Sequence, residues 1–338
     1  MNAINDVNYE ITRKNLEYLN EWLEFAEVDL ISATRLYKAG QKSEKGHIFY
    51  RYSLYHIQQA SEKIGKVYLW LVAKELLFVP SFIGADAAQK YRKTVNLLKR
   101  IASARGKNLG HGPISGFKDI NKFLRLYKEG EACRLILEFI DSVEKFILQK
   151  AKIPPNSEQE RTFRERFEVL RGFLKKHREG IKIVEIEKGR PYGLPNFEKL
   201  QIGLGNCDEM DSIFKKISQS LAEFRINDFA PNLKPIIEAF GIKVNVKKLR
   251  DVFENWKEFF TFLMSSLKEF VVLTTLWSLL APFVEARYPD QRIDNRTFEL
   301  IPELHKRLKQ ALSSAEEFNV FLLEMLPKIQ SSEKSTAG

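Results

Sequence analysis

The stretch YHIQQASEKIGK, from Tyr55 to Lys66, lies at the centre of a segment with a strong helical pattern. Apolar and small residues recur through it, and on either side of it, at spacings of three and four. These residues are Leu54, Ile57, Ser61, Ile64, Tyr68 and Leu71. Such spacing places the whole set on one face of an α-helix. Because Ala60, Ser61 and Gly65 are small, a neighbouring helix can approach this face closely.

The polar residues of the same stretch fit ordinary helix chemistry. Glu62 and Lys66 are four residues apart, in the order that favours an ion pair worth about 0.2 to 0.5 kcal/mol. Gln58, Gln59 and Lys63 are expected on the wetter side of the helix. These features alone require a helix and no function.

Three further segments predict long helices. The first carries the stripe Leu16, Leu19, Leu23, Ala26, Leu30, Ala33 and Tyr37 and is expected to end at Gly40. The second, residues 252–285, is apolar nearly all round and is expected in the interior. The last carries Leu304, Leu308, Ala311, Ala315, Phe318, Leu322 and Met325 and is expected to end before Pro327. Four such helices predict an antiparallel bundle.

The middle of the chain has a different pattern. A helical pattern from Leu124 to Lys150 is followed by the break KIPPNSEQ and by a charged helix from Arg161 to His177. IKIVEI, residues 181–186, alternates like a strand, and a second strand candidate lies near Ile242. We therefore expect a mainly all-α protein. Residues 1–112 and 250–338 form a discontinuous bundle, and residues 113–249 form a mostly helical insertion with up to one small β-hairpin.

Composition bounds the class of protein. The chain has 338 residues, of which 44% are hydrophobic and 29% charged, so a sizeable core is expected. The charge-free run from Phe270 to Val284 is interrupted by Pro282 and is too short to span a membrane. The first residues lack an apolar leader, which predicts a cytoplasmic protein. Cys133 and Cys207 are far apart and predict free thiols, and no metal or cofactor is expected.

The net charge of +10 is concentrated in one segment. Between Ala87 and Lys118 there is no Asp or Glu, and the basic residues there are Lys90, Arg92, Lys93, Lys99, Arg100, Arg105, Lys107 and Lys118. A segment of one sign attracts polyanions such as RNA. A solvated helix face is the alternative interpretation.

Several short elements occur in a fixed order along the chain. They are Trp22-Leu23, Ala26, Asp29-Leu30 and Ala33; then His56, Gln58-Gln59-Ala60, Glu62-Lys63 and Lys66; then Gly110-His111; then Arg287-Tyr288-Pro289-Asp290; and last the helix of Ala311 and Ala315. This order resembles the HEPN family over about residues 15–112 and 250–327. The resemblance implies a four-helix up-and-down bundle, usually a homodimer, that binds nucleotides or RNA. Some members are metal-independent ribonucleases, and others partner a small nucleotidyltransferase.

Ribonuclease members carry an Arg followed, after four to six residues, by a His. Arginine stabilises charge on the phosphate and histidine transfers a proton. The sequence holds the pairs Arg51 with His56, Arg105 with His111, and Arg171 with His177. The first pair is separated by about 140° around a helix, and the last lies outside the resemblance. We therefore expect Arg105 and His111 to be catalytic, although SARGKNLGHGP is also typical of a helix end followed by a glycine loop.

Arg287 is the other candidate phosphate ligand, and a favourable cation at a helix C-terminus is its alternative role. The predicted phosphate-binding residues are Lys90, Arg92, Lys93, Lys99, Arg100, Lys107, Asn108 and Arg287. The predicted function is RNA or nucleotide binding, with metal-independent RNA cleavage as a dependent hypothesis. The alternative is a noncatalytic partner of another protein, such as a minimal nucleotidyltransferase.

Overall fold

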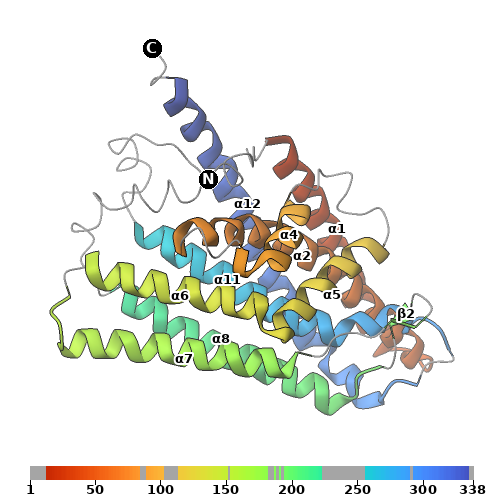
Figure 1. Ribbon diagram of the computed structural model, residues 1–338. Coiled ribbons are helices and arrows are strands. Elements are labelled where there is room, and N and C mark those ends of the chain that lie inside the picture. Colours follow the sequence, from red (N-terminus) through yellow and green to blue (C-terminus); the bar gives the residue numbers. More distant parts are fainter. Residues whose placement is uncertain are drawn as a thin grey trace.

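The computed structural model describes residues 13–83, 89–102, 113–150, 153–181, 186–187, 190–191, 194–222, 256–289 and 292–334. The described residues are almost entirely helical, which confirms the prediction of a mainly all-α protein (Figure 1). Among them, no helix combines the length and the apolar character that a membrane crossing requires.

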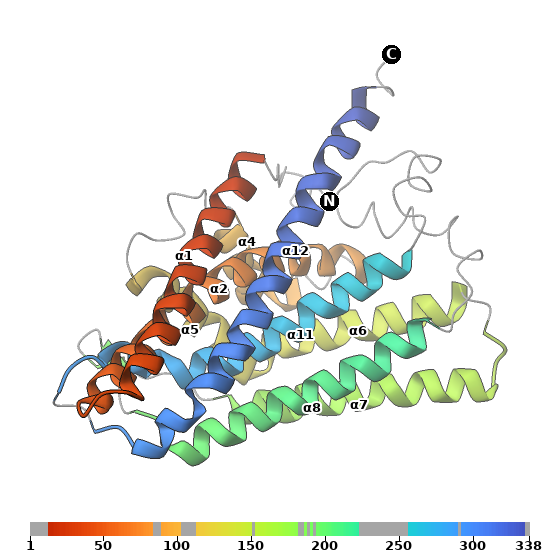
Figure 2. The ribbon, with the colours of Figure 1, turned by 180° about the vertical axis from the view of Figure 1, so that it is seen from behind.

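Four long helices correspond to the predicted bundle segments. They are α1 (Arg13–Gly40), α2 (Gly46–Ile83), α11 (Trp256–Leu280) and α12 (Ile301–Lys334). Helix α2 packs against the other three, and α1 also packs against α12. In Figure 2, α1 and α12 lie side by side in front of α2. Helix α1 ends at Gly40, as predicted.

Most residues of the predicted apolar stripes are buried where the structure describes their side chains, and Tyr37, at the end of the α1 stripe, is only partly buried. These buried residues are Leu19, Leu23, Ala26, Leu30 and Ala33 on α1; Leu54, Ile57, Ser61, Ile64 and Tyr68 on α2; and Leu304, Leu308, Ala311, Ala315 and Phe318 on α12. The predicted end before Pro327 is wrong, because α12 continues to Lys334. A proline removes one helical hydrogen bond, and a helix can bend there without ending.

The middle of the chain adds five helices among the described residues. They are α4 (Arg92–Ala102), α5 (Pro113–Glu129), α6 (Glu131–Lys150), α7 (Glu158–Gly180) and α8 (Phe197–Ala222). The single helical segment expected from Leu124 to Lys150 is divided between α5 and α6 at Gly130. Gly130 has a φ of 96°, which an α-helix cannot contain. Helices α6, α7 and α8 lie beside one another below α11 in Figure 1.

Short elements connect the helices. Strands β1 (Ile186–Glu187) and β2 (Arg190–Pro191) form one antiparallel pair. The second strand candidate near Ile242 lies outside the described residues. The apolar helix predicted to reach residue 285 ends at Leu280, and the 3₁₀ helix η4 (Ala281–Glu285) follows with Pro282 in its first turn. A second 3₁₀ helix, η5 (Asn295–Leu300), leads into α12.

Helix α11 joins the inserted helices to the rest of the molecule. It packs against α2 and against α8, and the buried core is continuous across both contacts. A Cβ atom built at Gly203 of α8 would lie 2.1 Å from Leu279 Cδ1, so glycine allows the two helices to approach closely. The division of the chain into a bundle of residues 1–112 and 250–338 and an insertion of residues 113–249 stays a prediction.

Gly130→Ala is expected to lower the free energy of unfolding by about 1 to 2 kcal/mol, because an L-residue at φ 96° is strained. Gly172→Ala is the matched control, since Gly172 lies inside α7 and a Cβ there would meet nothing within 4 Å. That change should stabilise the protein by about 0.5 to 1 kcal/mol. Urea denaturation of both variants gives the comparison, and effects of the same sign would contradict the assigned backbone conformations.

Candidate functional site

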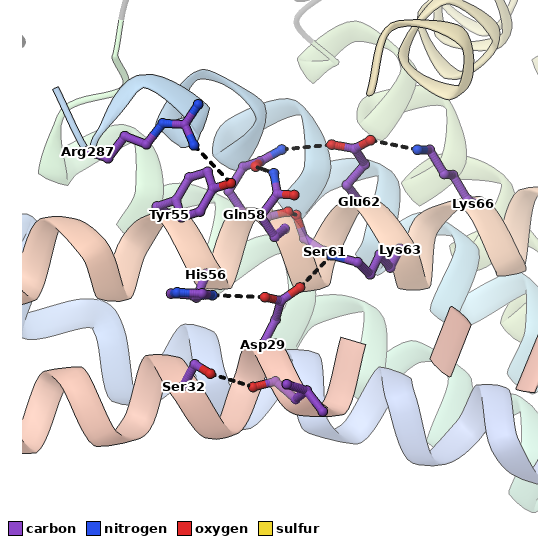
Figure 3. Close-up of polar contacts among 12 residues, drawn as sticks. Asp29, Ser32, Tyr55, His56, Gln58, Ser61, Glu62, Lys63, Lys66 and Arg287 are labelled. Atoms are coloured by element: carbon purple, nitrogen blue, oxygen red, sulfur yellow. Dashed lines mark hydrogen bonds and ion pairs between the residues drawn. The ribbon is translucent and has the colours of Figure 1, made fainter. Parts of the chain in front are cut away.

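An ionic bridge between α1 and α2 forms one side of the candidate site. His56 and Lys63 are seven residues apart on α2, about two helical turns, so they lie on the same face. Asp29 of α1 lies between them: its Oδ1 atom is 2.8 Å from His56 Nδ1, and its Oδ2 accepts a hydrogen bond of 2.5 Å from Lys63 Nζ (Figure 3). One carboxylate therefore fixes two side chains of α2.

The charge of Asp29 follows from its partners. Burial acts to raise the pKa of this carboxyl, but the hydrogen bonds from His56 and Lys63 outweigh it, and the pKa lies below its ordinary value. An ionised carboxylate accepts a hydrogen bond, so His56 Nδ1 carries the hydrogen. Nε2 of a neutral His56 is then the nitrogen with a free lone pair, and no described residue hydrogen-bonds to it. A histidine oriented in this way can accept or deliver a proton.

Arg51 positions the second side of the site. Its Nε donates to the backbone oxygen of Ala286 at 2.8 Å, and its Nη2 donates to that of Tyr288 at 2.7 Å. These two carbonyls flank Arg287 in the sequence. A charged side chain of α2 therefore holds the short segment that follows η4 in a defined place.

Arg287 extends from that segment onto two tyrosine rings. Its guanidinium carbon lies 4.8 Å from the centre of the Tyr55 ring and 5.1 Å from that of the Tyr288 ring. Arg287 Nη1 is 3.2 Å from the Tyr55 hydroxyl oxygen, as Figure 3 shows, and Nη2 is 3.2 Å from that of Tyr288. The Arg287 side chain is exposed, and within the described part of the chain no carboxylate forms a salt bridge with it.

The two sides meet at Tyr55. The rings of Tyr55 and His56 contact edge to face, with centres 5.4 Å apart. Arg287, Tyr55, His56 and Tyr288 therefore form a continuous surface, here called the Arg287 site. A guanidinium can bind phosphate, a tyrosine ring can stack on a base, and the imidazole can transfer a proton.

A buried polar network lies next to this site on α2. Glu62 accepts hydrogen bonds from Lys66 at 2.7 Å and from Gln58 at 3.2 Å. Lys66 Nζ lies 4.9 Å from the centre of the Trp22 ring. The predicted ion pair thus forms, but inside the protein. The expectation that Gln58 lies on the wetter side is wrong, because its side chain is only 1% exposed.

Helix α4 carries much of the predicted basic segment. Arg92 and Lys99 are seven residues apart, as are Lys93 and Arg100, so the four share one face of the helix. Arg92, Lys93 and Arg100 are exposed, and Lys99 is partly exposed. The opposite face is buried through Val95, Leu97 and Leu98.

Helix α6 brings acidic residues to this segment. Lys90, just before α4, forms a 2.5 Å ion pair with Glu138. Glu131 accepts a 2.6 Å hydrogen bond from the Thr94 backbone N–H at the start of α4. The segment has no acidic residue in its own sequence, but in the folded protein α6 places Glu131 and Glu138 beside it. The charge of Lys90 is therefore partly neutralised.

The three Arg and His pairs are placed differently. Arg105 and His111 lie outside the described residues, as do Lys107 and Asn108. Arg51 and His56 contact different partners, as their separation around the helix predicts.

The third pair, Arg171 with His177, is not brought together. Arg171 forms ion pairs with Asp141, Glu144 and Glu168. His177 is buried and bonded to Thr275. The structure therefore gives this pair no shared site.

In comparisons with known proteins, no family model, no curated protein and no solved structure matches this chain. Within the described residues, no three His, Cys, Asp or Glu side chains come together in the manner of a metal site.

Asp29→Asn is expected to lower the free energy of unfolding by about 1 to 2 kcal/mol, because both hydrogen bonds lose their charged acceptor. The pKa of Asp29 is lowered on folding, so its contribution is present above about pH 4 and is lost as the pH falls through the folded-state pKa. The variant should therefore lose less stability on acidification than the wild type.

Glu24→Gln is the control, since Glu24 is an exposed carboxylate of the same helix. Urea denaturation between pH 3 and 7 measures both effects. Equal stabilities for the two variants at pH 7 would contradict the bridging role of Asp29.

Proposed function

We propose that this protein is a HEPN-like helical-bundle protein that binds RNA or a nucleotide, with Arg287 as the central phosphate ligand. The observation that carries the proposal is an exposed guanidinium supported on two tyrosine rings beside a histidine. These are the groups that recognise the phosphate and the base of a nucleotide.

The backbone geometry supports phosphate binding by Arg287. Arg51 binds the carbonyls on both sides of Arg287, so the backbone there is already ordered before a ligand binds. Binding therefore costs little backbone entropy. The guanidinium keeps N–H groups that can donate hydrogen bonds to a phosphate, since its contacts with the described residues are to hydroxyl groups and ring faces. Tyr55 and Tyr288 offer flat surfaces for bases of any sequence.

Helix α4 and the net charge of +10 support an anionic ligand. Arg92, Lys93 and Arg100 are exposed on one face of α4, and α4 packs against α2, which carries Tyr55 and His56. A positive surface on a helix that packs against α2 would raise the local concentration of a polyanion and speed its association.

The resemblance to the HEPN family supports the same proposal. Four of its five ordered elements lie, in their described residues, on α1, on α2, in the segment after η4 and on α12, whereas Gly110-His111 lies outside the described residues. Three residues of the first two elements, Asp29, His56 and Lys63, form the bridge between α1 and α2. Following this resemblance, we also propose that four helices form an up-and-down bundle and that the protein is a homodimer.

RNA cleavage is the dependent part of the proposal. The 2′-hydroxyl would lose its proton to a base and attack the adjacent phosphorus. The new bond from the 2′ oxygen to phosphorus forms as the bond to the 5′ oxygen breaks, and an acid protonates that leaving oxygen. Arg105 and His111 are the sequence-based candidates for this step, without a metal. His56, oriented by Asp29, is the candidate within the described residues.

The second candidate function is a noncatalytic partner of another protein, such as a minimal nucleotidyltransferase. Phe25 and Val28 favour it, because they are three residues apart on α1 and are 64% and 59% exposed. Exposed apolar residues on one helix face are typical of protein interfaces. A pull-down that recovers only this protein would count against the nucleotidyltransferase partner.

Arg287→Ala is expected to weaken binding of a single-stranded RNA about 10- to 100-fold, because a charge-assisted contact is lost. It should also reduce the slope of log Kd against log salt by about 0.7, the value for one phosphate on a single strand. Arg161→Ala is the control, since Arg161 is an exposed arginine on α7. Fluorescence anisotropy over a salt series measures both quantities. Equal affinities for the two variants, or binding insensitive to salt, would rule out Arg287 as a phosphate ligand.

His111→Ala is expected to abolish RNA cleavage in EDTA while leaving RNA affinity nearly unchanged, because it removes a proton-transfer group and no phosphate ligand. His56→Ala, assayed beside it, separates the two candidate histidines. An unchanged cleavage rate in His111→Ala removes His111 from the mechanism. If only His56→Ala is inactive, the proton transfer belongs to the Asp29 and His56 pair.

A further inference from the structure

A separate pocket lies between α7, α8 and α11, at the contact between the inserted helices and the bundle. Its volume is about 290 Å³. Phe173 and His177 come from α7, Ile202 and Asn206 from α8, and Thr275 and Leu279 from α11. No residue of the Arg287 site lines this pocket. This volume is at the lower end of the range of about 300 to 1,000 Å³ that is typical of small-molecule sites.

His177 lines the pocket, and its ring carries a buried hydrogen-bond acceptor without a partner among the described residues. Thr275 Oγ1 donates its hydrogen to the Val271 backbone oxygen at 2.9 Å. It therefore accepts from His177 Nε2, which lies 2.9 Å away. With the hydrogen on Nε2, Nδ1 of a neutral His177 carries a free lone pair. Among the described residues no group hydrogen-bonds to this buried Nδ1.

His177 stays neutral at physiological pH. Burial lowers its pKa to about 4, because a charged imidazole would lose its hydration. The ring is also packed between aromatic side chains, stacked on Phe173 at 6.2 Å and edge-on to Tyr127 at 5.6 Å. A buried acceptor without a partner costs stability, and a ligand that donates a hydrogen bond would remove this cost.

The remaining walls combine apolar surface with a cationic rim. Ile202 lines the pocket and is 65% exposed, so it offers apolar surface to a ligand. Asn206 lines the pocket as well and is half-buried. At the rim, Lys176 forms a 3.4 Å ion pair with Glu209, whereas no carboxylate among the described residues forms a salt bridge with the exposed Lys199.

We propose that this pocket binds a small aromatic acid that also carries a hydroxyl or N–H group. The ring would lie against Phe173, Ile202 and Leu279, and the acid group would pair with Lys199. The hydroxyl or N–H would donate to His177 Nδ1 after a small adjustment of the pocket wall. The inserted helices would then carry a small-molecule site that is independent of the Arg287 site.

The probe for this proposal is 8-anilinonaphthalene-1-sulfonate, an aromatic anion with an N–H group. Its uncharged counterpart is N-phenyl-1-naphthylamine, which lacks the sulfonate. Fluorescence titration of the full chain should give one bound probe per chain. Lys199→Ala should weaken binding of the anion about three- to fivefold, as for an exposed ion pair, and leave the uncharged probe unaffected. Lys215→Ala, an exposed lysine of α8 outside the pocket, is the matched control and should change neither.

Asn206→Trp tests the pocket itself, since the larger side chain fills it and should abolish binding of both probes. Circular dichroism and thermal unfolding check that this variant is folded. If it is unfolded, Ser278→Leu, at another half-buried lining residue, takes its place. Probe binding that survives in a folded filled-pocket variant would overturn the proposal, as would equal affinities for the anion in Lys199→Ala and Lys215→Ala. Loss of probe binding in Arg287→Ala would place the probe at the Arg287 site and would also overturn it.

Discussion

The carboxylate of Asp29 holds α2 in the orientation on which the Arg287 site depends. Its two oxygens bind His56 and Lys63 on one face of α2, which fixes the rotation of that helix against α1. Helix geometry then directs Arg51 and Tyr55 to the segment after η4. Arg51 binds the backbone carbonyls on both sides of Arg287. The position of Arg287 therefore depends on α2, and the orientation of α2 depends on Asp29 of α1.

Helix α11 relates the two proposed sites to each other. It packs against α2, which carries Tyr55 and His56, and against α8, which lines the pocket of His177. The Arg287 site is exposed and cationic, which suits a polyanion. The His177 pocket is small and largely apolar, with a neutral imidazole, and suits a compact molecule. The two sites can therefore be tested independently.

Local periodicity predicted the helices and their buried faces, because burial of a stripe such as that of Leu54 and Ile64 depends mainly on spacing. Contacts between distant residues were not predictable in the same way. Gln58 is buried because other helices cover α2, and Glu138 reaches Lys90 from another helix. Of the candidate site, only Arg287 was among the predicted phosphate ligands, and His56 was considered as a partner of Arg51 and set aside. His56 and Lys63 are two helical turns apart, and this spacing in the sequence indicates that one side chain of a neighbouring helix could bind both.

The proposed function requires that RNA or a nucleotide contact the surface formed by Tyr55, His56, Arg287 and Tyr288. Photocrosslinking with a single-stranded RNA that contains 4-thiouridine, followed by mass spectrometry of the digested protein, measures this contact directly. We expect the modified peptides to contain Tyr55 or Tyr288, with the signal decreasing as salt is raised. Crosslinks confined to α7 and α8, or none at low salt, would contradict the account.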